Sequence, residues 1–330
     1  MFRNWCYDVG LFQSVIVNVP VLSVGNITTG GTGKTPFVEY LIRYCLNQKS
    51  KVAVLSRGYK RTTKGTNIVS DGMDINGTAE TMGDEPFQIA MKFPGIIVVV
   101  DEDRARAARM VVEKFKPDVI LLDDGFQHRG IVRDLDIVII DGTKSLLKIP
   151  MLPAGLRREP FSSLRRVDLL VLSRNYGSFS TIESVIQKYT KKPLVAVQFK
   201  PRRLYEIFAN KDIPLSKTEQ KSCVAFCGIG NPDSFKETLN EMGFAIKDLI
   251  VFPDHHRYNQ IDIQKIQRVY KECKAEYIIT TEKDAVRLRS INMPESFQFT
   301  ALFCVEIEAV ITEGEKILHD LLQQKLQRAA

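Results

Sequence analysis

The chain has 330 residues, 44% of them hydrophobic and 26% charged, which is typical of a globular protein with room for two domains. Its net charge of +7 favours an anionic partner, whether a nucleotide, a phosphorylated substrate, a phospholipid surface or a nucleic acid. No apolar run reaches the roughly 18 residues of a membrane-spanning helix, and the first residues lack the features of a secretory signal. Six scattered cysteines without a CxxC pair disfavour a zinc site and fit a reducing compartment.

Residues 1–19 are expected to form an amphipathic helix. Its apolar side chains recur at helical spacing and are Phe2, Trp5, Cys6, Val9 and Phe12. Such a stripe has two interpretations. The helix packs on the protein core, as any surface helix does, or it lies in a lipid interface with Trp5 and Phe2 dipping into the apolar layer.

The stretch Val21–Phe37, VLSVGNITTGGTGKTPF, predicts a strand, a glycine-rich loop and a helix that follows Gly33-Lys34-Thr35. This is the order of elements in a P-loop, whose backbone N–H groups surround phosphate oxygens while the Lys reaches the outer phosphates and the Thr hydroxyl ligates Mg²⁺. The first glycine of the general pattern falls at Thr28, so only the second half of that pattern is met. The alternative is a plain glycine-rich turn. The expected nucleotide-binding residues are Thr28, Thr29, Gly30, Gly31, Thr32, Gly33, Lys34 and Thr35.

Polar residues follow the next predicted elements. Arg57 comes directly after a strand at residues 51–56, at the edge where an open α/β sheet binds its ligands. Residues 60–82 are polar and indicate a long loop. Asp84 and Glu85 then open a helix, where acidic residues often serve only as caps. A strand at 95–100 and an arginine-rich helix at 101–114, which contains Arg104, complete this part.

A pair of acids ends the strand DVILLDD at residues 118–124. Asp123 and Asp124 occupy the position of a Walker B motif, which places a carboxylate beside the Mg²⁺ of a P-loop. Two adjacent acids there are costly unless a cation or hydrogen-bond donors neutralise them. A metal site formed by Thr35, Asp123 and Asp124 is therefore predicted, with a simple turn at DDGF as the alternative.

Strands and helices alternate through the rest of the chain, with further strands at residues 135–141 and 167–173. This alternation predicts an α/β fold with a mostly parallel sheet and helices on both faces. Residues 193–208 are interpreted as a connector, and a second βα series follows. We therefore expect a P-loop domain at residues 1–202 and a smaller α/β/α domain at 203–330.

Two of the four histidines are adjacent, His255 and His256 in FPDHHRY, in a loop after a predicted strand. A single histidine is usually structural. Two beside Asp254 raise the expectation of acid–base or metal chemistry.

Seven motifs taken together resemble the tetraacyldisaccharide 4'-kinase family, the bacterial lipid A 4'-kinases, and cover most of the chain from residue 24 to about 288. They are VGNITTGGTGKTP, LSRGYK, GDEP, DDGFQH, PAGLRREP, FPDHHRY and TEKDAV. The resemblance implies ATP- and Mg²⁺-dependent transfer of the γ-phosphate to the 4'-hydroxyl of a tetraacylated glucosamine disaccharide-1-phosphate. It also implies two α/β/α domains and peripheral attachment to the cytoplasmic face of the inner membrane through the N-terminal helix. It implies neither a nucleic-acid partner nor a protein partner.

The same motifs carry over residue roles. Asp84 of GDEP and His255 of the DHH loop are similar to a pair that activates the sugar hydroxyl, and His256 is the alternative member. A lone carboxylate beside ATP is too weak a base if Mg²⁺ and arginines lower its pKa further, whereas an imidazole in contact with that carboxylate has a raised pKa and a fixed tautomer. The remaining residues are assigned to the metal and active-site group or to phosphate and substrate contacts: Asp123, Asp124, Gln127 and His128, then Arg57, Arg104, Arg158, Glu85 and His256.

Two other classes of protein remain as alternatives at this point. A partition-type switch ATPase uses a similar glycine-rich loop, but the signature lysine of that class is absent because residue 29 is a threonine. A nucleic-acid-binding module is suggested by the basic charge. It is disfavoured because no basic run is interleaved with aromatic residues.

Overall fold

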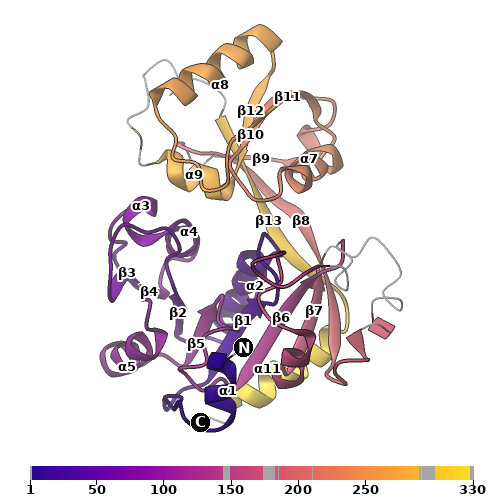
Figure 1. Cartoon of the computed structure of the whole chain (residues 1–330). Helices are drawn as coiled ribbons and strands as arrows, with labels where there is room; N and C mark the ends of the chain where they lie inside the picture. Colours follow the sequence, from indigo (N-terminus) through magenta and orange to yellow (C-terminus); the bar gives the residue numbers. More distant parts are fainter. Residues whose placement is uncertain are drawn as a thin grey trace. The chain divides into compact units, whose positions relative to one another are not determined.

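The computed structural model describes residues 2–327 except 144–148, 174–182, 185, 210, 290 and 292–301, and it contains two compact units (Figure 1). The first unit comprises residues 1–77, 81–199 and 309–330, and the second comprises residues 78–80 and 200–308. The α/β class predicted from the sequence is confirmed. The division differs from the expected one at the C-terminus, because the last helix, α11 (Glu315–Gln327), lies with the first unit.

The first unit is built on a sheet with the strand order β8-β7-β6-β1-β5-β2-β4-β3. Its pairings are parallel except for that of the edge strand β3 with β4. The strands are β1 (Val21–Asn26), β2 (Val52–Ser56), β3 (Asn67–Asp71), β4 (Ile97–Val100), β5 (Val119–Asp123), β6 (Leu135–Asp141), β7 (Leu169–Ser173) and β8 (Leu194–Glu206). The helices are α1 (Phe2–Asp8), α2 (Lys34–Asn47), α4 (Asp84–Lys92) and α5 (Arg104–Phe115), with the 3-10 helix η2 (Phe161–Arg166). The short α3 (Ala79–Met82) precedes α4 and has residues in both units.

Helices cover both faces of this sheet. One face packs against Ala107, Ala108 and Val111 of α5 through alternate strand residues such as Leu55 and Leu122. The strand residues that alternate with Leu55 and Leu122 point to the other face and are fully buried as well. Helix α2 packs against β1, β2 and β5. Because side chains alternate across a strand, α2 lies on the opposite face, as continuously apolar parallel strands require.

The second unit repeats this layering on a smaller parallel sheet, β11-β10-β12-β13. Along β10, Val224 and Phe226 face α8 and α9, whereas Cys223, Ala225 and Cys227 face α7. The elements are β9 (Asp212–Ile213), η3 (Leu215–Lys217), β10 (Ser222–Cys227), α7 (Pro232–Glu241), β11 (Ala245–Val251), α8 (Gln260–Cys273), β12 (Tyr277–Thr281), α9 (Glu282–Leu288) and β13 (Leu302–Glu313). The long strands β8 and β13 each contain residues of both units.

Two stretches are more regular than expected. The expected connector at residues 193–208 contains the single strand β8 (Leu194–Glu206), although Pro201 lies within it. Its pairings with β7 and β9 involve residues 194–197 and 204–205, so the missing N–H of Pro201 falls between them. The expected loop 60–82 contains β3 and α3, because Ile68 and Val69 are enough to add an edge strand to β4.

The N-terminal helix is shorter than predicted, since α1 ends at Asp8 rather than continuing to residue 19. Gly10 has a φ of 78°, which stops the helix, and Val15 then forms a parallel bridge with Ile131. Cys6 is buried, whereas Trp5, Leu11, Phe12 and Ile16 are exposed. None of the helices in the described part of the chain is long and apolar enough to cross a bilayer.

Candidate active site

The glycine-rich loop leads directly into the N-terminus of α2. Gly33 precedes the helix in the left-handed conformation, with φ 90° and ψ 23°, and no side chain caps this end. An uncapped N-terminus presents backbone N–H groups and the positive end of the helix dipole, which together favour a phosphate. Thr32 is buried and held by two bonds. Asn26 Nδ2 donates to its Oγ1 at 3.0 Å, and Ser173 Oγ donates to its carbonyl oxygen at 2.9 Å.

The ring of Phe199, on β8, lies against Gly33. Any Cβ atom at residue 33 would overlap that ring, and the positive φ disfavours other residues independently. The close approach explains why Gly33 directly precedes the lysine.

The first half of the loop, where the general P-loop pattern is not met, is supported by the PAGLRREP segment. Thr29 N donates to Leu156 O at 2.7 Å, and Arg158 N donates to Ile27 O at 2.7 Å. Thr28 is buried and bridges Arg157 in antiparallel pairing. In the general P-loop pattern a glycine occupies this position. Here the backbone around Thr28 is held by its pairing with the PAGLRREP segment instead.

Asp124 is the centre of a charged cluster at this end of the sheet. Arg158 Nη1 donates to its two oxygens at 3.0 and 2.8 Å, and Lys34 Nζ lies 3.5 Å from Oδ1. Gln127 Oε1 accepts a further bond from Arg158 at 3.3 Å. Burial raises the pKa of Asp124, but the positive charges of Lys34 and Arg158 outweigh it and hold the pKa below its usual value. The φ of Asp124 is 51°, an unfavourable backbone conformation of the kind that concentrates at functional sites.

The residues present fit a magnesium ion held together with a nucleotide. Asp123 is buried at the end of β5, with Oδ2 3.4 Å from Ser56 Oγ, and Thr35 is the buried second residue of α2. Within the described ranges, no group of three His, Cys, Asp or Glu side chains could hold a metal by itself. Mg²⁺ commonly takes one or two protein oxygens and completes its shell with water and phosphate oxygens, so a sparse oxygen set is suitable.

Two other predicted residues, Arg104 and His128, have shifted pKa values. Burial lowers the pKa of Arg104 to about 10, although Asp124 acts in the opposite direction. Burial and the charge of Arg104 lower the pKa of His128 to about 4, so its imidazole is neutral at pH 7. His128 Nε2 has no hydrogen-bond partner among the described residues.

The neutral His128 ring predicts a pH-dependent stability of the ligand-free protein. Because the pKa in the folded state lies below the ordinary 6.5, the unfolded chain takes up the proton first. The stabilisation is complete above pH ~6.5 and is lost as the pH falls towards about 4; by pH 5 the loss amounts to about 2 kcal/mol.

Urea unfolding at pH 7.5 and pH 5 measures this loss. The wild type should lose more stability than His128→Asn, whose side chain does not titrate. An identical loss in both proteins would mean that the ring is not held neutral.

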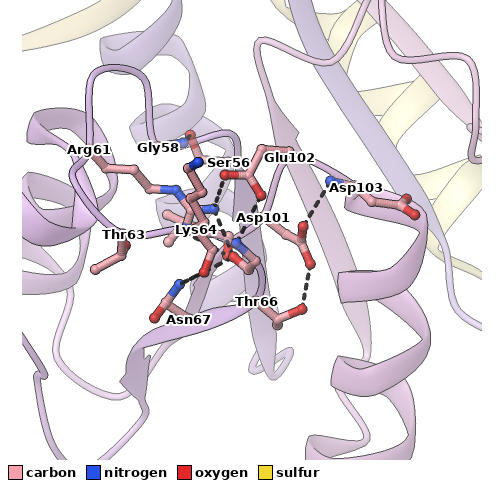
Figure 2. A network of polar contacts seen from close by, with 12 residues as sticks. Ser56, Gly58, Arg61, Thr63, Lys64, Thr66, Asn67, Asp101, Glu102 and Asp103 are labelled. Atoms are coloured by element: carbon pink, nitrogen blue, oxygen red, sulfur yellow. Dashed lines mark hydrogen bonds and ion pairs between the residues drawn. The ribbon is translucent and has the colours of Figure 1, made fainter.

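The loop that follows Arg57 is fixed to the sheet by a polar network (Figure 2). The fully buried Asp101 accepts bonds from Thr66 Oγ1, from Asp103 N at 2.8 Å and from Arg106 Nη2 at 2.6 Å. Arg61 Nη2 donates to Glu102 Oε1 at 2.6 Å and to Gly65 O at 2.7 Å. The network connects residues 61–66 to the end of β4, while Arg57 itself remains exposed.

Asp84 and Glu85 are the half-buried first residues of α4. Gly83 before them has a φ of 97°, and a Cβ atom there would lie 3.0 Å from Gly58 Cα. The loops that carry Arg57 and Asp84 therefore touch through two glycines, which brings GDEP beside LSRGYK.

The two histidines of the DHH loop lie in the second unit and have different environments. His256 Nε2 pairs with Asp262 Oδ2 at 2.9 Å, and its ring stacks on Phe252 at 4.7 Å between centroids. His255 has a φ of 62°, and its Nε2 lies 3.9 Å from Asp254 Oδ1. Its pairing with Asp84, a residue of the first unit, stays a prediction.

Sequence analysis missed three polar residues that support the loop and the acids: Asn26, Ser56 and Ser173. Each lies at the carboxyl end of a buried strand, which is the edge where parallel sheets bind ligands. The sequence did contain a signal for these three residues, because each is a polar residue at the end of an apolar run.

Comparisons with known proteins agree with this geometry. The family model described as Tetraacyldisaccharide-1-P 4'-kinase matches residues 1–327. A tetraacyldisaccharide 4'-kinase of Syntrophus aciditrophicus is 39% identical, over 87% of this chain and 80% of the relative. One from Chlorobium phaeobacteroides is 36% identical, over 99% and 94% respectively. The crystal structure of LpxK from Aquifex aeolicus in complex with ATP matches with a TM-score of 0.79 and 33% identity, covering 98% of this chain and 94% of that chain. The chain therefore belongs to the tetraacyldisaccharide-1-P 4'-kinase family.

Proposed function

We propose that the protein transfers the γ-phosphate of ATP, with Mg²⁺, to the 4'-hydroxyl of a tetraacylated glucosamine disaccharide-1-phosphate, a step of lipid A biosynthesis. One observation carries the proposal. Lys34 is the first residue of α2, whose N-terminus has no side-chain cap, and its Nζ lies 3.5 Å from Asp124, directly after β5. The relatives named above are 4'-kinases of tetraacyldisaccharides, and one of the matched structures holds ATP.

On the nucleotide side, residues 28–35 would surround the phosphates, with Lys34 on the outer ones. Thr35 and Asp123 would hold Mg²⁺, with Asp124 beside them. When bound, the ion neutralises charge on the β- and γ-phosphates and orients the transferred group. Lys34 and Arg158 pair with Asp124, so the cations of the site are held next to its acids.

Asp123→Asn is expected to raise the Mg²⁺ concentration needed for half-maximal activity by about tenfold or more, because an amide is a poorer ligand for a hard cation than a carboxylate. A Mg²⁺ titration of kinase activity measures the shift. Asp118, which directly precedes β5, provides the control, because Asp118→Asn makes the same change at the opposite end of the strand. An unchanged titration in Asp123→Asn would transfer the role to Asp124.

On the acceptor side, we assign Asp84 and His255 to activation of the sugar hydroxyl. This assignment rests on the GDEP and DHH motifs. Phosphate and substrate contacts are assigned to Arg57, Arg104 and Arg158, with supporting roles for Glu85, Gln127, His128 and His256.

We further propose that residues 1–17 contact the cytoplasmic face of the inner membrane. Trp5 is 51% exposed, Phe12 47% and Ile16 76%, an unusual set of apolar side chains within twelve residues. A tetraacylated acceptor is held in a bilayer, so an enzyme that phosphorylates its sugar must reach the lipid surface. The positive net charge favours an anionic membrane.

Trp5 is the only tryptophan of the chain, so intrinsic fluorescence reports on it alone. Its emission should shift to the blue when vesicles containing an anionic phospholipid are added, because the exposed indole enters the apolar layer. Neutral phosphatidylcholine vesicles provide the control for the electrostatic contribution. Emission that does not respond to either vesicle would exclude the membrane contact.

A direct assay tests the function as a whole. With [γ-³²P]ATP, Mg²⁺ and the tetraacyldisaccharide-1-phosphate in detergent, label should appear in the lipid product. A switch ATPase or a nucleic-acid-binding protein would instead hydrolyse ATP without labelling lipid, and DNA would stimulate the hydrolysis in the second case.

A further inference from the structure

We propose that Asn4 of α1 is a positioning residue for the nucleotide site, because it bridges the two segments that carry Asp124 and Arg158. The proposal rests on the proposed function, which assigns these two residues to the site. It also gives α1 a second role, since its exposed apolar side chains are assigned above only to the membrane.

Asn4 uses its side chain for one segment and its backbone for the other. Its Nδ2 donates to Glu159 Oε2 at 2.9 Å, and its carbonyl oxygen accepts a bond from Arg129 Nη1 at 2.9 Å. Glu159 directly follows Arg158 in the PAGLRREP segment, and Arg129 directly follows the DDGFQH segment, which contains Asp124. The ion pair of Arg158 with Asp124 joins the same two segments at the site itself. Asn4 is therefore a second link between them.

The carboxylate that accepts the Asn4 amide is buried and is held at its other oxygen as well. Glu159 is 4% exposed, and Arg166 Nη2 donates to its Oε1 at 2.8 Å. The same Nη2 donates to Phe126 O at 3.3 Å, and Arg166 Cζ lies 3.8 Å from the centroid of the Phe126 ring. A buried carboxylate requires donors, and donors on both oxygens fix its orientation. Asn4 thus contributes directly to the position of the residue that follows Arg158.

A second bond from α1 reaches the DDGFQH segment. Arg3 Nη2 donates to Gln127 O at 2.5 Å. Gln127 in turn donates from Nε2 to Asn26 O at 2.8 Å and accepts a bond from Arg158 Nη1 at 3.3 Å. Asn26 ends β1, where the chain enters the glycine-rich loop. A shift of α1 would therefore reach the phosphate-binding loop through one intervening residue.

Asn4 lies on the face of α1 that contacts the protein. Asp8 is one helical turn further along and also contacts Arg129, whose Nη1 donates to Asp8 Oδ1 at 2.6 Å. Cys6 is 3% exposed, whereas Trp5 is 51% exposed. The helix therefore has one face bonded to the segments of the site and another that carries exposed apolar side chains. A substitution at Asn4 can disturb the first face and leave the second unchanged.

Asn4→Ala tests the proposal without endangering the helix, because alanine is the best helix former. The dissociation constant of the full chain for ATP with Mg²⁺ is measured by calorimetry without lipid or vesicles. It should rise about tenfold, the lower end of the effect of losing an outer partner of a site. Trp5 emission should still shift to the blue with anionic vesicles, because the apolar face is unchanged.

Asp8→Asn is the matched control. It weakens the ion pair of α1 with Arg129 and leaves the bond between Asn4 and Glu159 in place. The affinity for ATP should therefore equal that of the wild type, even where thermal unfolding shows a loss of stability. If looser attachment of α1 were the cause of the effect, Asp8→Asn and Asn4→Ala would weaken ATP binding alike, which would overturn the proposal.

Exchange of the two bonded groups gives a second, independent test. Asn4→Asp sets a carboxylate against Glu159 and should weaken ATP binding more than Asn4→Ala does. Asn4→Asp combined with Glu159→Gln again pairs one amide with one carboxylate, so the double variant should recover most of the affinity. A double variant that binds ATP no better than Asn4→Asp would contradict the bridge.

Failure of this proposal is distinguishable from failure of the proposed function. Equal affinity for ATP in the wild type and Asn4→Ala would reject the positioning role and leave the nucleotide site intact. Absence of ATP binding by the wild type would reject the nucleotide assignment itself, and the positioning role with it.

Discussion

Lys34→Ala is expected to lower kcat by about 10³-fold or more at saturating ATP. The Lys34 ammonium is the cation of the P-loop that reaches the outer phosphates, and negative charge on the transferred group is redistributed in the transition state. The ammonium lies 3.5 Å from Asp124, and this ion pair holds it at the site. A group that is positioned in advance contributes most to the transition state, because little reorganisation is needed.

The measurement is steady-state transfer of label to the lipid at several ATP concentrations. Lys236→Ala, which removes an exposed lysine from α7, is the control and should behave as the wild type. If Lys34→Ala retained near-normal turnover under saturating ATP, the assignment of residues 28–35 to phosphate binding would be wrong.

Asp84→Asn and His255→Ala should each lower kcat by about 10²- to 10⁴-fold, the range for loss of a general acid–base group. A sugar hydroxyl is a poor nucleophile, and a group must accept its proton as the phosphoryl group is transferred. If the two residues act as one unit, removal of either already removes the unit. The kcat of the double variant should then lie within a few fold of the kcat of the slower single variant.

The alternative outcome is independent action, in which the two losses multiply. Multiplication would separate Asp84 from His255 and leave each with a role of its own. His256→Asn is the control, because His256 contributes to the start of α8 through Asp262 and should affect stability more than kcat. Thermal unfolding of every variant distinguishes loss of chemistry from loss of fold.

The elements of the proposed nucleotide site could be predicted because their signals are local. The apolar run of β1, the glycines that follow it and Lys34-Thr35 are adjacent in the chain, and the acids Asp123 and Asp124 directly end β5. Such patterns depend on backbone rules that hold within a few residues. The family, the α/β fold and the use of ATP were accessible for the same reason.

Features that depend on distant contacts were not accessible. Phe199 is 166 positions from Gly33, and Ser173 is 141 positions from Thr32, so nothing local marks either contact. The C-terminal helix α11 was expected in the second domain but lies with the first unit. Its His319 forms a hydrogen bond with Tyr40 of α2, and the sequence gives no sign of this long-range contact. Residues 193–208 were interpreted as a connector rather than one strand because Pro201 interrupts them. The sequence does not tell which backbone groups of a strand are paired, so it does not tell where a proline is tolerated.

The most direct test of the kinase assignment is the position of the phosphate in the lipid product. The wild-type protein, ATP and Mg²⁺ should convert the tetraacyldisaccharide-1-phosphate into a bisphosphate, with a new ³¹P resonance coupled to the proton at carbon 4'. The conversion should stop when EDTA removes the metal. Hydrolysis of ATP without a phosphorylated lipid, or a phosphate at another hydroxyl, would contradict the account.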